Sequence, residues 1–116
     1  KRERNTLKCA IHVENNTEKE RGIKIFRDYH PFAGAKPKNT TTFVYDNFGN
    51  QYIPEKIKIG PRVTSRNDIT QSFIPYIPIK VIFIITDFNE NATHITLAIS
   101  VDEFKQRLVL KDITIN

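Results

Sequence analysis

The densest apolar stretch of the chain, residues 73–101, constrains its fold more than any other feature. Residues 79–86 read IKVIFIIT, a β-branched and aromatic run with the length of one strand, too short to cross a membrane as a helix. We expect a central strand there, buried on both faces. Residues 94–101 alternate apolar and more polar side chains, which predicts a second strand with one dry face. The acidic and amide residues 87–91 favour a turn, so the two strands are expected to form a core hairpin.

Shorter segments in which apolar and polar side chains alternate lie on both sides of this stretch. Each is bounded by turn-forming residues, and each therefore predicts a strand. They are residues 7–13, 22–26, 40–45, 51–53, 56–59 and 104–115. We expect the first two to form a hairpin and the last to contain a shift at Lys111 and Asp112. Residues 63–68 are polar and predict a connection.

Strand-length segments separated at short intervals by turns are typical of two packed antiparallel sheets. We therefore expect an all-β sandwich of about seven or eight strands. A chain of 116 residues has the length of a single domain. Residues 7–116 are expected to form that domain. Residues 1–6 are expected to be disordered or to be a trimmed N-terminus, because the chain opens without a methionine.

Charge and cysteine content limit the classes of partner and of chemistry. The net charge of +5 raises the question of an anionic partner, but the basic residues are scattered along the chain and most have acids beside them. This distribution favours an ordinary, slightly basic surface. Cys9 is the only cysteine, which excludes an intrachain disulfide. Alternation places its thiol on the apolar face of a strand, where it acts as a small hydrophobe.

No constellation of residues specifies a reaction. The three histidines, His12, His30 and His94, have no spacing that brings two ring nitrogens to one metal. Ser100 and Asp102 lie near His94 in the sequence, but His94 and Ser100 share one face of a strand roughly 20 Å apart. We therefore expect neither an enzyme nor a bound metal or cofactor.

Two loops carry aromatic residues that attract attention. Residues 28–39 contain two prolines and a glycine, and a loop of this length is often functional or disordered. The favoured interpretation is that Phe32 plugs one end of the sandwich, and the alternative is an exposed contact patch. Residues 46–50 form a turn in which Gly49 can adopt a positive φ, but they offer too few oxygen ligands for calcium. The candidate contact residues, if the fold brings both loops to one end, are Tyr29, His30, Phe32 and Phe48.

Three sequons, at Asn15, Asn39 and Asn91, fall in or beside expected turns, as glycosylation acceptors must. In a chain rich in Asn and Thr such triplets also arise by chance. They carry weight only in a eukaryotic secretory source.

The order of these features resembles a known family. The segments that carry the resemblance are LKCAIHVENNT, TTFVYDNFGNQYIPEKI, IPYIPIKVIFIITDF, ITLAISV and RLVLKDITI. They resemble the immunoglobulin-like β-sandwich domain of bacterial secreted proteins and lipoproteins, in which a strand runs into an Asp-x-x-Gly-x-x-Tyr element. Asp46, Gly49 and Tyr52 match that element. Residues 75–78, PYIP, replace the Pro-Gly more usual before the core strand.

The resemblance implies an immunoglobulin-like two-sheet sandwich outside the cytoplasm, secreted or anchored through a segment that this chain lacks. Together with the expected sandwich and the absence of a reactive site, the resemblance leads us to expect a non-catalytic binding or structural module, whose partner is another protein or an envelope component. The alternative hypothesis is a small β-barrel nucleic-acid-binding protein that uses basic residues with interleaved aromatics such as Tyr45, Phe48 and Tyr52.

Overall fold

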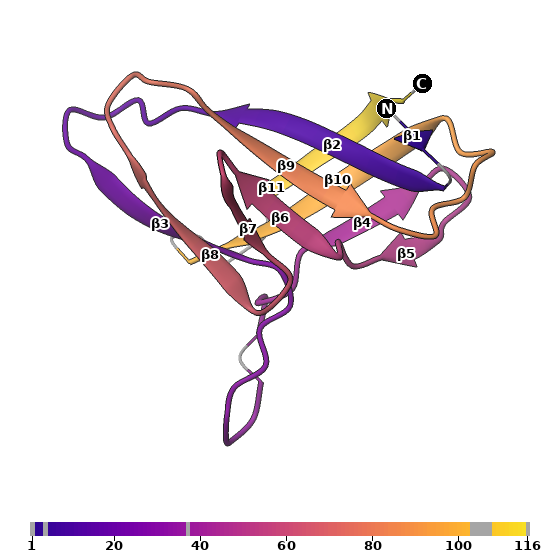
Figure 1. Cartoon of the computed structure of the whole chain (residues 1–116), viewed down its shortest axis with the longest axis horizontal. Coiled ribbons are helices and arrows are strands. Elements are labelled where there is room, and N and C mark those ends of the chain that lie inside the picture. The colour runs from indigo at the N-terminus through magenta and orange to yellow at the C-terminus, as the bar shows by residue number, and fades with distance from the viewer. Residues whose placement is uncertain (1, 4, 37, 103–107, 116) are drawn as a thin grey trace.

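The computed structural model describes residues 2–3, 5–36, 38–102 and 108–115. It is all-β: two antiparallel sheets are stacked as a sandwich, and the first lies in front of the second in Figure 1. The described residues include no helix, so none of them forms one that could span a membrane. The first sheet contains, in spatial order, β1 (Arg2–Glu3), β2 (Thr6–Val13), β9 (Ile79–Ile85), β6 (Lys56–Ile59) and β7 (Arg62–Thr64).

The second sheet is built around one strand that has neighbours on both sides. Its order is β5 (Gln51–Tyr52), β4 (Phe43–Asp46), β10 (His94–Val101), β3 (Arg21–Phe26) and β8 (Asp68–Phe73), and β11 (Leu108–Thr114) also pairs with β10. The described residues thus form eleven strands rather than the expected seven or eight. The three strands that the sequence did not predict are the two-residue strand β1 and the strands β7 and β8.

The expected core hairpin is wrong, because its two strands lie in different sheets. β9 pairs with β2 and β6, whereas β10 pairs with β4, β3 and β11. The chain crosses from one sheet to the other between them. This arrangement places the apolar face of β9, with Phe83, opposite that of β10, with Leu97, and both side chains are 0% exposed. If β9 and β10 had paired within one sheet, their apolar side chains would lie on the same sheet, and a further layer would be needed to bury them.

The expected hairpin of residues 7–13 and 22–26 is wrong for the same reason. β2 pairs antiparallel with β9 over its length from Leu7 to Val13, and β3 pairs with β8 in the other sheet. Both strands present alternating apolar side chains, so each can cover the other across the sandwich. Local turn signals alone cannot distinguish a hairpin from a crossing of this kind.

Burial of the strands follows the period of two. In β9, Val81, Phe83 and Ile85 are 0% exposed, whereas Ile82 and Ile84 are only half-buried on the outer face. The expectation that this strand is buried on both faces is therefore wrong, since nothing in the described chain covers the outer face of the first sheet. The shift at Lys111 and Asp112 is confirmed: Ile95 pairs with Ile113 but Leu97 pairs with Leu110, which inserts one extra residue into β11.

Two further differences concern segments of low apolar content. β8 occupies DITQSF, where only Ile69 and Phe73 are buried and the polar Gln71 lies between them on the same face. Apolar and polar side chains alternate only weakly in this segment, so the sequence does not predict β8. At the N-terminus, Arg2–Glu3 form β1 within the segment expected to be disordered or trimmed, and the backbone oxygen of Asn5 accepts a hydrogen bond from Phe88 (2.7 Å).

The difference between the two faces of β9 predicts a difference in stability. We expect Phe83→Ala to lower the free energy of unfolding by about 3 to 5 kcal/mol, because it leaves a cavity between the sheets. Ile82→Ala on the outer face is expected to cost about 1 kcal/mol. Urea unfolding of both variants measures this, and equal losses would contradict the assignment of the two faces.

Candidate functional site

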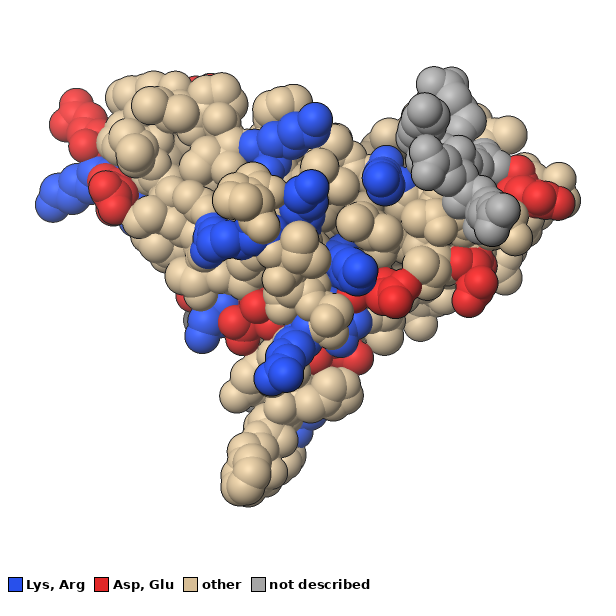
Figure 2. Space-filling model, in the orientation of Figure 1, with Lys and Arg blue, Asp and Glu red and all other residues tan. Residues whose placement is uncertain are grey.

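The most distinctive surface feature is the segment that joins β3 to β4. It leaves the body as a long protrusion at one edge of the sandwich (Figures 1 and 2). Two backbone hydrogen bonds close its base, from Tyr29 to Thr40 (2.9 Å) and from Thr42 to Arg27 (3.0 Å). We call residues 28–41 the projecting loop. Its ends are fixed to the sheet, while its middle extends away from it.

A polar cluster holds the two arms of the projecting loop together. The Asp28 carboxylate accepts hydrogen bonds from Lys36 Nζ (2.6 Å), His30 Nε2 (2.9 Å) and Thr41 Oγ1 (2.8 Å). The Asp28 side chain is 16% exposed, so these contacts are partly shielded from water. Lys36 Nζ also donates to Thr41 Oγ1 (2.7 Å), which closes the cluster on itself.

The cluster changes the acidity of Asp28. Partial burial raises its pKa, but the hydrogen bonds from Lys36, His30 and Thr41 and the charge of Lys36 outweigh burial and lower the pKa from 3.8 to about 2. The carboxylate is therefore ionised throughout the physiological range. Sequence analysis named the aromatic residues of this loop but missed Asp28. The spacing Asp-x-His, which places both side chains on one side of an extended segment, was the available signal.

The tip of the projecting loop is apolar and fully exposed. Phe32 is 106% exposed, and residues 31–35, PFAGA, carry no charge. Gly34 has a φ of 89°, a left-handed conformation that favours glycine at the reversal. The interpretation that Phe32 plugs the end of the sandwich is therefore wrong. The polar contacts at the base direct the tip outward, so Phe32 cannot reach the core.

The other candidate contact residues have different surroundings. Tyr29 is half-buried and packs edge-on against Phe26 with ring centroids 5.8 Å apart, so it belongs to the base of the loop. His30 is exposed beside Asp28. Phe48 is 59% exposed, but its turn follows β4 whereas the projecting loop precedes β4. The fold thus separates Phe48 from Phe32, and the two loops do not form one surface.

The turn that contains Phe48 is organised by a buried carboxylate. Asp46 is 6% exposed and accepts hydrogen bonds from the backbone of Phe48 (2.8 Å) and Asn50 (3.0 Å) and from the Tyr52 hydroxyl (2.8 Å). Burial raises the pKa of Asp46, but these hydrogen bonds and that of the Asn50 side chain lower it below its usual value. Gly49 has a φ of 87°, as expected.

Tyr52 connects this turn to the crossing between the sheets. Its hydroxyl donates to Asp46 and accepts a hydrogen bond from the backbone of Asn89 (3.2 Å), and its ring packs against Phe88 with centroids 4.9 Å apart. Phe88 is 2% exposed. The Asp-x-x-Gly-x-x-Tyr element is therefore a structural joint between β4, β5 and the segment that follows β9.

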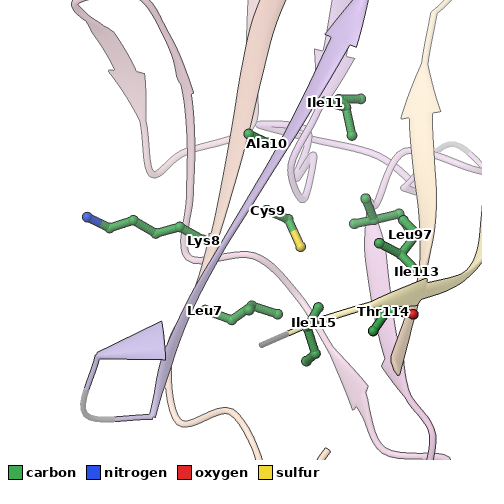
Figure 3. A pocket seen from close by; sticks show the side chains of 9 residues that line it. All are labelled: Leu7, Lys8, Cys9, Ala10, Ile11, Leu97, Ile113, Thr114 and Ile115. Atoms are coloured by element: carbon green, nitrogen blue, oxygen red, sulfur yellow. The ribbon is translucent and has the colours of Figure 1, made fainter. Parts of the chain in front are cut away.

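An opening lies along the edge of β2, between the two sheets. A cavity of about 200 Å³ is lined by Leu7, Cys9 and Ile11 of β2 and by Leu97 and Ile113 opposite. Figure 3 shows the Cys9 sulfur on the side of the strand that faces these residues, as expected from alternation. Burial raises the pKa of the thiol to about 11, so it stays protonated and is a poor nucleophile.

His94, Ser100 and Asp102 do not hydrogen-bond to one another, and each has a different partner. His94 Nδ1 lies 2.9 Å from Thr93 Oγ1, the Ser100 hydroxyl donates to the backbone oxygen of Asn39, and Asp102 accepts from the backbone of Lys24 (2.9 Å). Among the described residues, no three His, Cys, Asp or Glu side chains form a group that could hold a metal ion.

The asparagine of the first sequon, Asn15, stabilises the fold through its side chain. Asn15 is 8% exposed, and its amide nitrogen donates to the backbone oxygens of Lys19 (2.8 Å) and Phe73 (2.9 Å). Its amide oxygen accepts hydrogen bonds from Thr17. Asn15 therefore fixes the turn after β2 and is not accessible for glycosylation in the folded chain. Asn91 and Asn39 are exposed.

Comparisons of the chain with models of known protein families, with curated proteins and with solved structures find no match. The projecting loop and the surfaces of the sheets are therefore the features that bear on function.

The pKa of Asp28 predicts how the base of the projecting loop responds to acid. Because the folded pKa is about 2 and the ordinary value is 3.8, the stabilisation by Asp28 is complete above about pH 4 and is lost as the pH falls toward 2. We expect the amide protons of Tyr29 and Thr42 to lose protection from exchange over this range. Asp28→Asn should show the weakened state at all pH values, and identical acid profiles for both proteins would contradict the role of Asp28.

The joint at Tyr52 predicts a contrast between two tyrosines. Tyr52→Phe removes the hydrogen bonds to Asp46 and Asn89 while keeping the ring contact, so we expect a loss of about 1 to 3 kcal/mol in unfolding free energy. Tyr45→Phe is the matched control, since the Tyr45 hydroxyl accepts only an exposed hydrogen bond from Gln51 (2.8 Å). Its expected cost is below about 0.5 kcal/mol. Similar melting temperatures for the two variants would contradict a stabilising role of the Tyr52 hydroxyl.

Proposed function

We propose that this chain is a non-catalytic binding module that contacts another protein through the tip of the projecting loop. The observation that carries the proposal is Phe32, which is 106% exposed at the end of a segment whose base is fixed. A large aromatic side chain held in water gains free energy when a partner covers it, and burying a Phe is worth about 1.5 to 3 kcal/mol. Aromatic anchors of this kind often dominate interfaces.

The clamp at the base supports this proposal. Asp28, Lys36 and Thr41 join the two arms of the loop before any partner arrives. A preorganised loop loses less conformational entropy on binding than a free one. The tip itself, residues 31–35, offers an apolar contact without charge to desolvate. These features suit insertion of Phe32 into an apolar pocket of a partner.

The proposed setting is a secreted or envelope-associated protein. It rests on the resemblance of the strand and turn sequences to immunoglobulin-like domains of that kind, and on the two-sheet sandwich with which such a domain is consistent. In such modules the sheets act as a scaffold and the loops carry recognition. A scaffold role fits the chain, because the polar clusters around Asp28 and Asp46 fix loops and turns on the sheets.

The proposal is tested by placing a photo-crosslinking phenylalanine analogue at position 32 and, as the matched control, at position 48. Both side chains are exposed, at 106% and 59%, but they lie on different loops. We expect one discrete crosslinked protein from position 32 in extracts of the source cells, and none from position 48. Competition by excess unlabelled protein should abolish that product, whereas the Phe32→Ser variant should not compete.

Phe32→Ser should also leave the melting temperature unchanged, because the side chain makes no core contact. The same crosslinked product from both positions, or effective competition by Phe32→Ser, would contradict a contact through the tip. Loss of folding in Phe32→Ser would show that the side chain packs in the core instead.

A further inference from the structure

The register of the first sheet gathers lysines that are far apart in the sequence. Paired residues on neighbouring strands share a face, and Ile84 of β9 pairs with Lys8 of β2 on one side and Lys56 of β6 on the other. In the same way Ile82 pairs with Lys58. Adjacent strands are about 4.8 Å apart and alternate residues about 7 Å, so the backbone positions of these lysines lie within roughly 12 Å of each other.

Lys80 completes this surface, in the row beside His12. We call the outer side of β2, β9 and β6 that carries Lys8, Lys56, Lys58 and Lys80 the lysine face. Each row of paired residues across it includes a lysine, and Asp and Glu are absent from the paired positions between Lys8 and His12.

The charges of the lysine face are not neutralised by ion pairs within the part of the chain that the structure describes. None of its four lysines forms an ion pair with a described residue, in contrast to Lys36, which binds Asp28 at 2.6 Å. Figure 2 shows Lys and Arg side chains over the middle of this side of the molecule, and Asp and Glu at its two ends and beside basic side chains in its lower part. Four of the 18 basic residues of the chain thus share the outer side of one sheet.

Shape and apolar content indicate the kind of partner. Figures 1 and 2 view the molecule down its shortest axis, and the extents of 42 × 37 × 26 Å make the side with the lysine face broad. Between the lysines, Ile82 and Ile84 are only half-buried. We propose that the lysine face binds the surface of an anionic lipid bilayer, with the ammonium groups at the headgroups and the isoleucines at the interface.

A bilayer fits these observations better than a nucleic acid. The paired positions of the lysine face hold no Phe, Tyr or Trp side chain on which bases could stack and no arginine that could bind a phosphate with two hydrogen bonds. Tyr45, Phe48 and Tyr52, the aromatics of the nucleic-acid hypothesis, lie on or between β4 and β5 of the other sheet. The projecting loop leaves the body at an edge, so the two contacts are independent.

The experiment is co-sedimentation with vesicles of phosphatidylcholine, with and without phosphatidylglycerol, at low and high salt. We expect binding only to the vesicles that contain phosphatidylglycerol, lost at high salt because the charges are exposed. Lys56→Gln with Lys58→Gln should weaken it roughly 25-fold, at about fivefold per lysine. The charge-matched control is Lys19→Gln with Lys24→Gln, since neither residue lies on the first sheet.

The control pair is expected to bind within about twofold of the unchanged protein, and Phe32→Ser to bind normally, which separates this result from the proposed protein contact. Equal losses in both lysine pairs, or binding to phosphatidylcholine alone, would overturn the proposal. So would a duplex or single-stranded oligonucleotide that binds more tightly than the vesicles and loses affinity in the Lys56 and Lys58 variant, because the face would then serve a nucleic acid. Unchanged circular dichroism of both variant pairs would confirm that the substitutions preserve the fold.

Discussion

The structure depends on one contact: the apolar face of β9 lies against that of β10 across the sandwich. Phe83 and Leu97 are both 0% exposed there, and the chain must cross between the sheets to bring them together. Phe88 fills the crossing and is 2% exposed. Because the densest apolar segments of the chain cover each other, the outer side of the first sheet is left to lysines and to the half-buried Ile82 and Ile84.

Polar side chains then fix the segments that the core does not reach. Asp46 organises the turn between β4 and β5 through hydrogen bonds, and Tyr52 ties that turn to the crossing. Asn15 does the same for the turn after β2, and Asp28 for the projecting loop. Partly or fully buried polar groups of this kind are stabilising only because each has partners. The chain thus uses its carboxylates and amides as structural supports.

The two proposed contacts differ in physical character. The tip of the projecting loop offers one aromatic side chain, Phe32, on a preorganised support, which favours a specific pocket. The lysine face offers several unpaired charges spread over three strands, which favours an extended anionic surface without defined geometry. A module that lies on a bilayer by its sheet and contacts a second protein by its loop would combine both.

The sequence by itself determined the class of fold and most of the strands, because the period of two in segments such as Thr6–Val13 and His94–Val101 reports which side chains are buried. It also determined that the Cys9 thiol is buried and that the chain turns at Gly49, since both follow from residues adjacent in the sequence. Only the tertiary structure decided which strands pair, because a hairpin and a crossing between sheets carry the same local pattern. For that reason only the register could reveal that Lys8, Lys56, Lys58 and Lys80 share one face, and only the path of the chain could place Phe32 outside the core.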